Sequence, residues 1–294
     1  TTNGGGTYDA GVSVNVTATP NVGYTFTNWT ESGIEVSTNA SYTFAINANR
    51  TLVANFKSSF PIGQLPVVLG TAARFAILSN SDLTNIPTSS ITGDVGMSPG
   101  LRSNMTGFVL TPDITNQFST DPQVNGGGPG IYAANDAAPT PSMLIKAKAD
   151  AEAAYLDATA ALRGTPTPLS GNINGLTLVP GLYESGSSIE ISPGGAVTLD
   201  AGGNNNAVFI IRSATSITTQ ATSKVVLAGN ANPANIFWVA GSAVTLGTNS
   251  IMKGTIIASS SISLLTGANL VGRVLIQSAA AGQISLDQNT IVLP

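Results

Sequence analysis

The chain has 294 residues, of which 9% are charged, whereas an ordinary soluble domain contains about 25%. Its net charge is −4 and its eleven basic residues are scattered, which excludes nucleic acid as a partner because phosphate binding needs clustered Lys and Arg. The absence of Cys and His excludes disulfides, thiolate metal sites and the His-dependent nucleophile systems, and we expect neither a metal nor a cofactor.

The polar surface of the folded chain must come from short neutral side chains. Ser, Thr and Asn supply it, with Gly in the turns, because so few residues are charged. Such a surface suits a partner that is itself neutral and forms hydrogen bonds, such as water, ice or carbohydrate. No apolar run approaches the roughly 20 residues that a membrane span needs, so we expect no transmembrane segment.

Residues 1–57 predict a small antiparallel β domain. The alternating runs 12–16 (VSVNV) and 42–46 (YTFAI) are separated by Gly, Pro and Asn, which is the pattern of short strands joined by turns. The aromatic residues are expected to form the small core of this domain rather than a platform for stacking sugars. They are Tyr24, Phe26, Trp29, Phe44 and Phe56.

The same segment resembles a bacterial surface-protein repeat of the internalin B-repeat type. The resemblance rests on Tyr24-Thr-Phe, on Asn28-Trp29 and on the closing Ala54-Asn-Phe. It implies a spacer or a part of an adhesin, linked to the cell surface or to further repeats. Residues 58–66 are then expected to form a short linker before a second domain at residues 67–294.

One helix is predicted in the second domain, from Pro139-Thr-Pro141 to about Arg163. Apolar residues recur there every three or four positions and form one stripe, which comprises Leu144, Ala147, Ala151, Tyr155, Ala158 and Leu162. The charged side of the helix is expected to face solvent, with Lys146, Lys148, Asp150, Glu152 and Asp157. Gly164 and the prolines after it end the helix.

The short strands after the helix predict a solenoid of stacked coils. Four runs are apolar at consecutive positions, so both faces of each strand should be buried: 208–211, 236–239, 256–258 and 274–276. An alternating strand follows each of the last three runs. The repeat is about 20 residues, with 18 from Thr245 to Ser263 and 22 from Ser263 to Ser285. The helix is expected to cover the doubly buried strands.

The alternating strands predict a column of hydroxyl side chains on one surface. Their inward residues are expected to be Ile217, Val244, Ile262 and Ile284, then Thr219, Leu246, Leu264 and Leu286, of which Thr219 departs from the apolar pattern. The outward residues between them are Thr218, Thr245, Ser263 and Ser285. These would stack at the spacing of about 4.7–4.9 Å between neighbouring strands. Thr248 and Thr266 supply a second position at the strand ends, which Asn289 is a candidate to extend.

An ordinary solvated face explains this column as well, because Thr is favoured in strands and a half-buried sheet needs polar residues outside. A rigid, flat array could instead hold ordered water in a lattice close to that of hexagonal ice. Methyl groups would help to cage the water while hydroxyl groups anchor it. The scarcity of charge on this surface favours the second explanation.

Residues 67–294 resemble the family of microbial ice-binding proteins. The matching segments, in order, are 75–78 (FAIL), 92–99 (TGDVGMSP), 138–141 (APTP), 179–183 (VPGLY), 235–238 (NIFW), 244–248 (VTLGT), 253–258 (KGTIIA) and 286–290 (LDQNT). The resemblance implies a mainly β fold, namely a discontinuous, right-handed, triangular parallel β-solenoid. It also implies one long helix packed along one face, and ice bound on the flat face beside it.

The resemblance also implies an antifreeze function, with thermal hysteresis and inhibition of ice recrystallisation, in a monomer that is secreted or held at the cell surface. The ice-facing position of the family maps onto Thr218, Thr245, Ser263 and Ser285, with Thr248 and Thr266 beside them. An earlier coil places Glu190 at this position. A carboxylate holds its own hydration tightly, so we expect the C-terminal coils to dominate ice binding.

Two other classes of function compete with ice binding. An enzyme that cleaves polysaccharides needs two carboxylates held several ångströms apart. Its candidates, Glu184, Glu190, Asp200 and Asp287, are far apart in sequence and off the repeat, so we predict a protein without catalytic activity. The main alternative is a carbohydrate-binding or adhesive surface module without ice activity. Such a module would need a glycan or protein partner, whereas an ice binder shapes ice crystals without one.

Overall fold

The computed structural model of the chain describes residues 1–20, 24–58, 64–125, 130–277 and 282–294. The chain forms two compact units, Thr1–Pro61 and Ile62–Pro294. The expected linker, residues 58–66, lies in part outside the described residues. Its last residues are fastened within the second unit, because Gln64 Nε2 donates to the Arg163 carbonyl at 3.1 Å and the Arg163 guanidinium donates to the Leu65 carbonyl.

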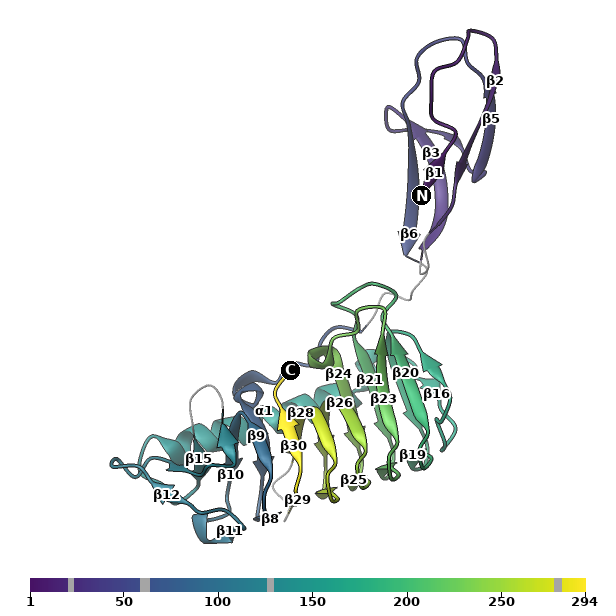
Figure 1. The fold of residues 1–294 in the computed structure, drawn as a ribbon. Helices are drawn as coiled ribbons and strands as arrows, with labels where there is room; N and C mark the ends of the chain where they lie inside the picture. Colours follow the sequence, from purple (N-terminus) through teal and green to yellow (C-terminus); the bar gives the residue numbers. More distant parts are fainter. Residues whose placement is uncertain (21–23, 59–63, 126–129, 278–281) are drawn as a thin grey trace. The chain divides into compact units, whose positions relative to one another are not determined.

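The first unit contains two three-stranded antiparallel sheets (Figure 1). They comprise β1 (Thr2–Asn3), β2 (Ser13–Ala18) and β5 (Ser41–Ala45), and β4 (Ile34–Ser37), β3 (Tyr24–Glu31) and β6 (Leu52–Ser58). Trp29 is buried in its core, and Phe26, Phe44 and Phe56 pack against that core. Tyr24 is exposed, so the expectation that it belongs to the core is wrong. It lies at the first position of β3, where the strand has not yet entered the core.

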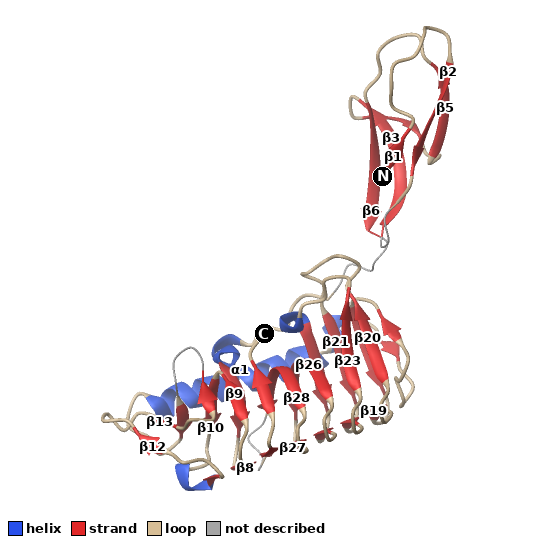
Figure 2. Cartoon of the chain, in the orientation of Figure 1, coloured by secondary structure: helices blue, strands red, loops and turns tan. Residues whose placement is uncertain are grey.

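The second unit is a stack of mainly parallel strands that form three faces (Figure 2). We call the separate seven-stranded sheet the candidate face. Its strands, in pairing order, are β11 (Met105–Thr106), β8 (Asp82–Ile86), β29 (Gln283–Asp287), β27 (Ser261–Leu264), β25 (Val244–Leu246), β22 (Ile217–Thr219) and β19 (Ile189–Ile191).

The other two faces belong to one continuous sheet. The helix face contains β16 (Thr167–Pro168), β18 (Gly181–Ser185), β21 (Phe209–Ser213), β24 (Ile236–Ala240), β26 (Ile251–Ala258), β28 (Asn269–Ile276), β7 (Phe75–Ser79), β10 (Asp94–Met97) and β15 (Ile131–Ala133). The third face contains β17 (Thr177–Leu178), β20 (Ala196–Asp200), β23 (Lys224–Ala228), the first halves of β26 and β28, β30 (Thr290–Val292), β9 (Ser90–Thr92) and β14 (Val124–Asn125). Next to β15 lies a short hairpin of β12 (Thr111–Pro112) and β13 (Ser119–Thr120).

The order of the coils in space differs from their order in the chain. Strands β7, β8 and β9 precede the helix, yet they stack on β28, β29 and β30 at the end of the chain (Figure 1). The coils that follow the helix begin at the other end of the stack, with β16 to β19. This is possible because the helix carries the chain along the stack between the two ends. We call the junction of β7–β9 with β28–β30 the seam.

The helix α1 (Thr140–Thr159) covers the helix face (Figure 2). Its residues Leu144, Ala147, Ala151 and Ala158 are buried, as the sequence predicts. Along each strand beneath it, successive side chains point alternately toward the helix and into the solenoid. Ile210, Phe237, Ile257 and Leu275 pack in the cluster with the helix, while Phe209, Trp238, Ile256 and Val274 pack inside the solenoid. The prediction that these strands are buried on both faces is therefore confirmed.

Three expectations about the helix are wrong. It ends at Thr159 rather than near Arg163, and Leu162 lies fully exposed in a 3-10 turn, Ala161–Arg163. The helix ends where Ala160 becomes extended (φ −62°, ψ 142°), and the Arg163 guanidinium beyond it pairs with Asp157. Lys148 is not simply solvated, since its Nζ donates to the Ile276 carbonyl and burial lowers its pKa to about 7. The remaining 3-10 turns are Gly70–Arg74, Arg102–Asn104 and Pro233–Asn235.

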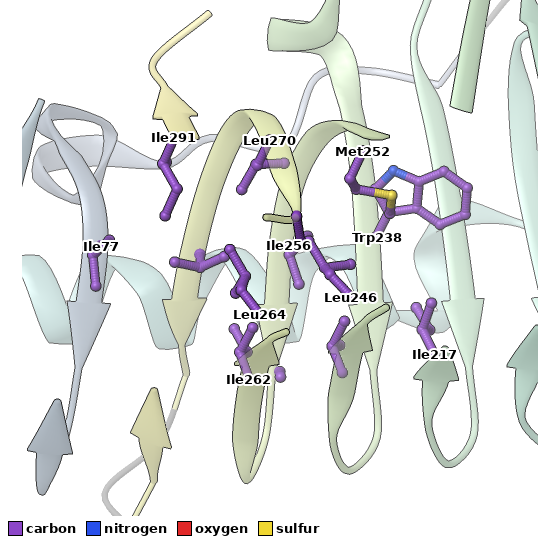
Figure 3. Close-up of a cluster of buried hydrophobic side chains, with 14 of the residues drawn as sticks. Ile77, Ile217, Trp238, Leu246, Met252, Ile256, Ile262, Leu264, Leu270 and Ile291 are labelled. Atoms are coloured by element: carbon purple, nitrogen blue, oxygen red, sulfur yellow. The ribbon is translucent and has the colours of Figure 1, made fainter. Parts of the chain in front are cut away.

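Mainly aliphatic side chains fill the interior of the solenoid, together with Trp238 and Met252 (Figure 3). The predicted inward residues Ile217, Val244, Ile262, Ile284, Leu246, Leu264 and Leu286 are all buried. The Trp238 indole N–H donates to the Lys253 carbonyl at 2.9 Å, so this large side chain is buried without losing its hydrogen bond. The exception in the pattern, Thr219, is also buried. Its hydroxyl donates to Ser250 Oγ at 3.1 Å and accepts from the Gly247 N–H at 3.2 Å.

Candidate functional site

A column of outward side chains runs the full length of the candidate face. The strands pair in register, so each residue of the column lies beside the next: Glu190, Thr218, Thr245, Ser263, Ser285, Thr84 and Thr106. We call these seven residues the rungs. Neighbouring rungs are one strand spacing apart, about 4.8 Å. The structure therefore brings the four predicted column residues together as consecutive rungs.

Thr84 and Thr106 were missed by sequence reasoning because they precede the helix. Pairing of β29 with β8 aligns Thr84 with Ser285, and pairing of β8 with β11 aligns Thr106 with Thr84. Both threonines are exposed. The available signal was an outward Thr84 after the inward Leu83. The polar Asn85 at the second inward position hid the alternation, as Thr219 does in β22.

The side chains around Thr245 are small. Each strand also directs outward the residues two positions before and after its rung, because side chains alternate between the two sides. Thr245 is flanked in this way by Ala243 and Gly247, and Ser261 precedes the neighbouring rung Ser263. No long side chain projects beside Thr245 along its own strand, whereas the neighbouring coil exposes Leu265 two positions after Ser263.

Serine hydroxyls fix the corner that leads into the candidate face. Each closes a turn by donating its Oγ to a backbone carbonyl three residues later: Ser185 to Ser188 at 3.2 Å, Ser213 to Ser216 at 2.9 Å and Ser79 to Asp82 at 2.6 Å. Each turn ends two positions before a rung. The rungs of β19, β22 and β8 are thus held by the same local device.

In the five coils that contain β19, β22, β25, β27 and β29, the corner that leaves the candidate face contains one left-handed residue. These residues are Gly194 (φ +66°), Thr222 (φ +59°), Asn249 (φ +54°), Gly267 (φ +71°) and Gln288 (φ +53°). Gly and Asn adopt this conformation readily, whereas the β-branched Thr222 is strained in it. The Thr222 N–H donates to the Thr248 carbonyl and the Asn249 N–H to the Thr266 carbonyl. Thr248 and Thr266 therefore lie in the turn rather than in the strands, with Thr248 half-buried and Thr266 exposed.

Side-chain hydrogen bonds order part of this surface. Ser285 Oγ donates to Ser263 Oγ at 3.1 Å, and Thr266 Oγ1 donates to Asp287 Oδ2 at 2.5 Å. Asn289 does not extend the second column, and that expectation is wrong. Its side chain is buried because its amide nitrogen donates to two backbone carbonyls inside the turn, at 2.9 and 3.2 Å.

Charge is confined to one end and to the rims of the candidate face. Glu190 lies on the terminal strand β19, beyond which a single β-bridge joins it to Asn172. Asp82 and Asp287 lie on the rims, two positions before and two positions after a rung. The six rungs from Thr218 to Thr106 are uncharged.

The four carboxylates considered for catalysis do not converge. Glu184 pairs with Arg212 on the helix face, and Asp200 lies on the third face. Glu190 and Asp287 lie on strands of the candidate face with three other strands between them. Within the described ranges, no group of three or more acidic side chains could hold a metal ion. In the same ranges, no helix combines the length and the apolar character needed to cross a membrane.

Comparison with known proteins yields two family matches. Residues 77–292 match the family described as ice-binding-like, and residues 1–60 match the divergent InlB B-repeat domain. Both resemblances inferred from the sequence are thereby confirmed.

Individual relatives match over most of their length. An ice-binding protein of Flammulina populicola is 35% identical over 81% of this chain and 92% of its own length. An ice-binding protein of Flavobacterium frigoris is 33% identical over 90% of both chains. Among solved structures, an ice-binding protein from an Arctic yeast is 36% identical with a TM-score of 0.72, over 79% of this chain and 95% of that one.

Proposed function

The chain belongs to the ice-binding-like family, and on that premise we propose that it adsorbs to ice through the candidate face. The observation that carries this proposal is the in-register column of six uncharged Thr and Ser rungs from Thr218 to Thr106. The ice-contacting residues are Thr218, Thr245, Ser263, Ser285, Thr84 and Thr106, with Thr248 and Thr266 at the rim.

The physical basis is the regular spacing of small amphipathic groups on a rigid surface. Parallel strand pairing repeats the rungs at about 4.8 Å, which is close to a repeat of hexagonal ice. A hydroxyl can donate to and accept from lattice water, and the Thr methyl limits the number of other arrangements that water can adopt. The solenoid interior is fully packed, so the rungs need no reordering on contact, and little entropy is lost on binding.

Glu190 sets the limit of this surface. Replacing the hydration shell of a carboxylate by the fixed geometry of ice is unfavourable, because an ionised group loses several kcal/mol when its hydrogen bonds to water are not replaced. Glu190 is the last rung at its end of the sheet, so the unfavourable contact is at the edge. Ice contact is therefore centred on the rungs from Thr218 onward.

Adsorption at this surface blocks the local growth of ice, which gives thermal hysteresis and inhibits recrystallisation.

Membership of the family supports further parts of the proposal. The solenoid coils are right-handed with a triangular section. The protein is exported, acts as a monomer and needs no cofactor, and residues 1–57 serve as a spacer or a link to a surface or to further repeats.

Substitution of Thr245 by tyrosine tests the face directly. The phenol projects beyond the small residues Ala243 and Gly247 that flank it and separates the neighbouring rungs from the ice. We expect Thr245→Tyr to lose most of the thermal hysteresis of the full chain, measured with ice-crystal shape at equal protein concentration. The matched control is Thr198→Tyr, an outward residue between the buried Val197 and Leu199 on the third face, which should keep the hysteresis.

Three outcomes separate the alternatives. Loss of hysteresis in Thr245→Tyr alone, with unchanged circular dichroism, supports the proposal. Loss in Thr198→Tyr instead places ice contact on the third face. Round, freely growing ice crystals with the unmodified chain refute ice binding and favour a carbohydrate-binding or adhesive module, which glycan arrays would then test.

A further inference from the structure

The proposed ice-contacting surface is assembled from two chain segments that are far apart in sequence. Ser285 and Thr84 are neighbouring rungs, although 201 positions separate them. Across this seam, β29 and β8 share five residue pairs, β30 and β9 share three, and β28 and β7 share two. Within the C-terminal coils, β26 and β28 share eight. These eight pairs extend over the third face and the helix face, and among the three pairings at the seam the ladder is shortest on the helix face.

A buried hydrogen-bond network spans the seam beside the candidate face. Asn289 and Ser89, from opposite sides of the seam, are 1% and 4% exposed. The Asn289 N–H donates to Ser89 Oγ at 3.0 Å, and Ser89 Oγ donates to Asn85 Oδ1 at 2.7 Å. The chain of bonds therefore passes from the end of β29 to the end of β8.

The network continues on both sides to groups that carry rungs. On one side, the Asp287 N–H donates to Asn289 Oδ1 at 2.7 Å, and the Asp287 carboxylate accepts from Thr266. On the other side, Asn85 Nδ2 donates to the Gly107 carbonyl at 3.1 Å, and Gly107 directly follows the rung Thr106. Four successive coils of the surface are thus joined by one set of bonds.

The hydrogen-bond donors and acceptors of these buried side chains have partners within the protein. Both hydrogens of the Asn289 amide and its oxygen have backbone partners. Gln123 Oε1 accepts from the Ser89 N–H at 2.8 Å and from Asn85 Nδ2 at 2.9 Å. Buried amides in this arrangement bind no ligand themselves, but they fix the relative positions of the segments that they join.

We propose that Asn289, Ser89 and Asn85 are positioning residues that hold the rungs on the two sides of the seam in one plane. The inference rests on the proposed function. Ice recognition needs several rungs in the lattice geometry at once, so a small relative shift at the seam separates Thr84 and Thr106 from the four uncharged rungs before them. The surface that acts on ice is then shortened without unfolding of the solenoid.

The test compares two buried hydroxyl deletions in the full chain. Ser89→Ala removes the bonds to Asn289 and Asn85. Thr140→Val removes a buried bond of similar kind, from Thr140 Oγ1 to the Gln117 carbonyl at 2.6 Å, at the start of α1 and away from the rungs. Both are measured for thermal hysteresis, circular dichroism at 4 °C, melting temperature, and hydrogen exchange of the β29 and β8 amides.

We expect Ser89→Ala to lose at least half of the hysteresis while folded at 4 °C, with faster exchange at the seam, and Thr140→Val to keep it. Gln123→Ala acts at the less buried end of the network and provides a second variant, with a smaller loss expected. Equal fractional losses in Ser89→Ala and Thr140→Val, or wild-type hysteresis in Ser89→Ala, would overturn the positioning role alone. An unmodified chain without hysteresis would refute the proposed function and this inference together.

Discussion

Replacing Gly272 by alanine tests the corner at which β26 and β28 pass from the third face to the helix face. Gly272 pairs in register with Gly254, whose φ is +113°. A Cβ at position 272 would lie 1.9 Å from the Gly254 carbonyl oxygen and 2.6 Å from its carbon. The obstacle is backbone, so no side chain can rotate away, and the neighbouring coil must move by roughly 1 Å.

This displacement acts on a close-packed interior, where overpacking costs about 1–3 kcal/mol and backbone obstruction falls at or above the upper end. We expect Gly272→Ala to lower the free energy of unfolding by about 3 kcal/mol. For a unit of this size, that corresponds to a fall in melting temperature of about 6–12 °C. Differential scanning calorimetry of the full chain measures it.

The control is Gly186→Ala, in an exposed turn where an added Cβ meets nothing within 4 Å. It should change stability by no more than about 0.5 kcal/mol. If Gly272→Ala melts within about 2 °C of the wild type, the close approach of the two glycines does not constrain the stacking of the coils, and the reasoning is refuted.

Three further predictions concern the candidate face and its surroundings. The double substitution Ser263→Thr and Ser285→Thr adds a methyl group to each of two central rungs and should increase thermal hysteresis at equal protein concentration. An unchanged hysteresis would mean that the methyl groups at these rungs do not contribute to ice binding. Thr222→Asn relieves a β-branched residue of its left-handed conformation and should raise stability by about 1 kcal/mol, seen as a melting temperature about 2–4 °C higher. The pKa of Lys148 is lowered to about 7 by burial, so the unfolded chain binds more protons than the folded chain between pH 7 and the ordinary value of 10.5. The free energy of unfolding should therefore rise with pH over this window, by at most about 1.4 kcal/mol per pH unit. Urea unfolding at pH 7 and pH 9.5 measures this rise, which should be larger in the wild type than in Lys148→Met.

The part of the site that follows the helix could be predicted because sequence order and spatial order agree there. Thr245, Ser263 and Ser285 follow one another at intervals close to one coil, and each lies between inward aliphatic residues. Periodicity therefore revealed both the column and its direction. The resemblance to a known family independently indicated the same positions, because its motifs match the sequence around them.

The rest could not be predicted from periodicity, for physical reasons that differ from residue to residue. Thr84 joins the column only through pairing of β8 with β29, and no local pattern encodes contact between strands that are so far apart in sequence. Asn289 looked like a surface residue because its polarity does not reveal that a tight turn supplies it with buried partners. Leu162 fitted the helical stripe in spacing, but the helix ends at Thr159 and Arg163 turns back to pair with Asp157 in its last turn.

The length of the helix that covers one face is coupled to the number of coils that form the other two. Its 20 residues rise about 30 Å, and its buried positions from Leu144 to Ala158 recur every 3 or 4 residues, or about 5 Å. That interval nearly equals the strand spacing of about 4.8 Å, so each added strand would need its own helical residue above it. A longer ice-contacting surface therefore requires two matched insertions. For each coil inserted after Gly164, three or four residues must be inserted into the helix before it.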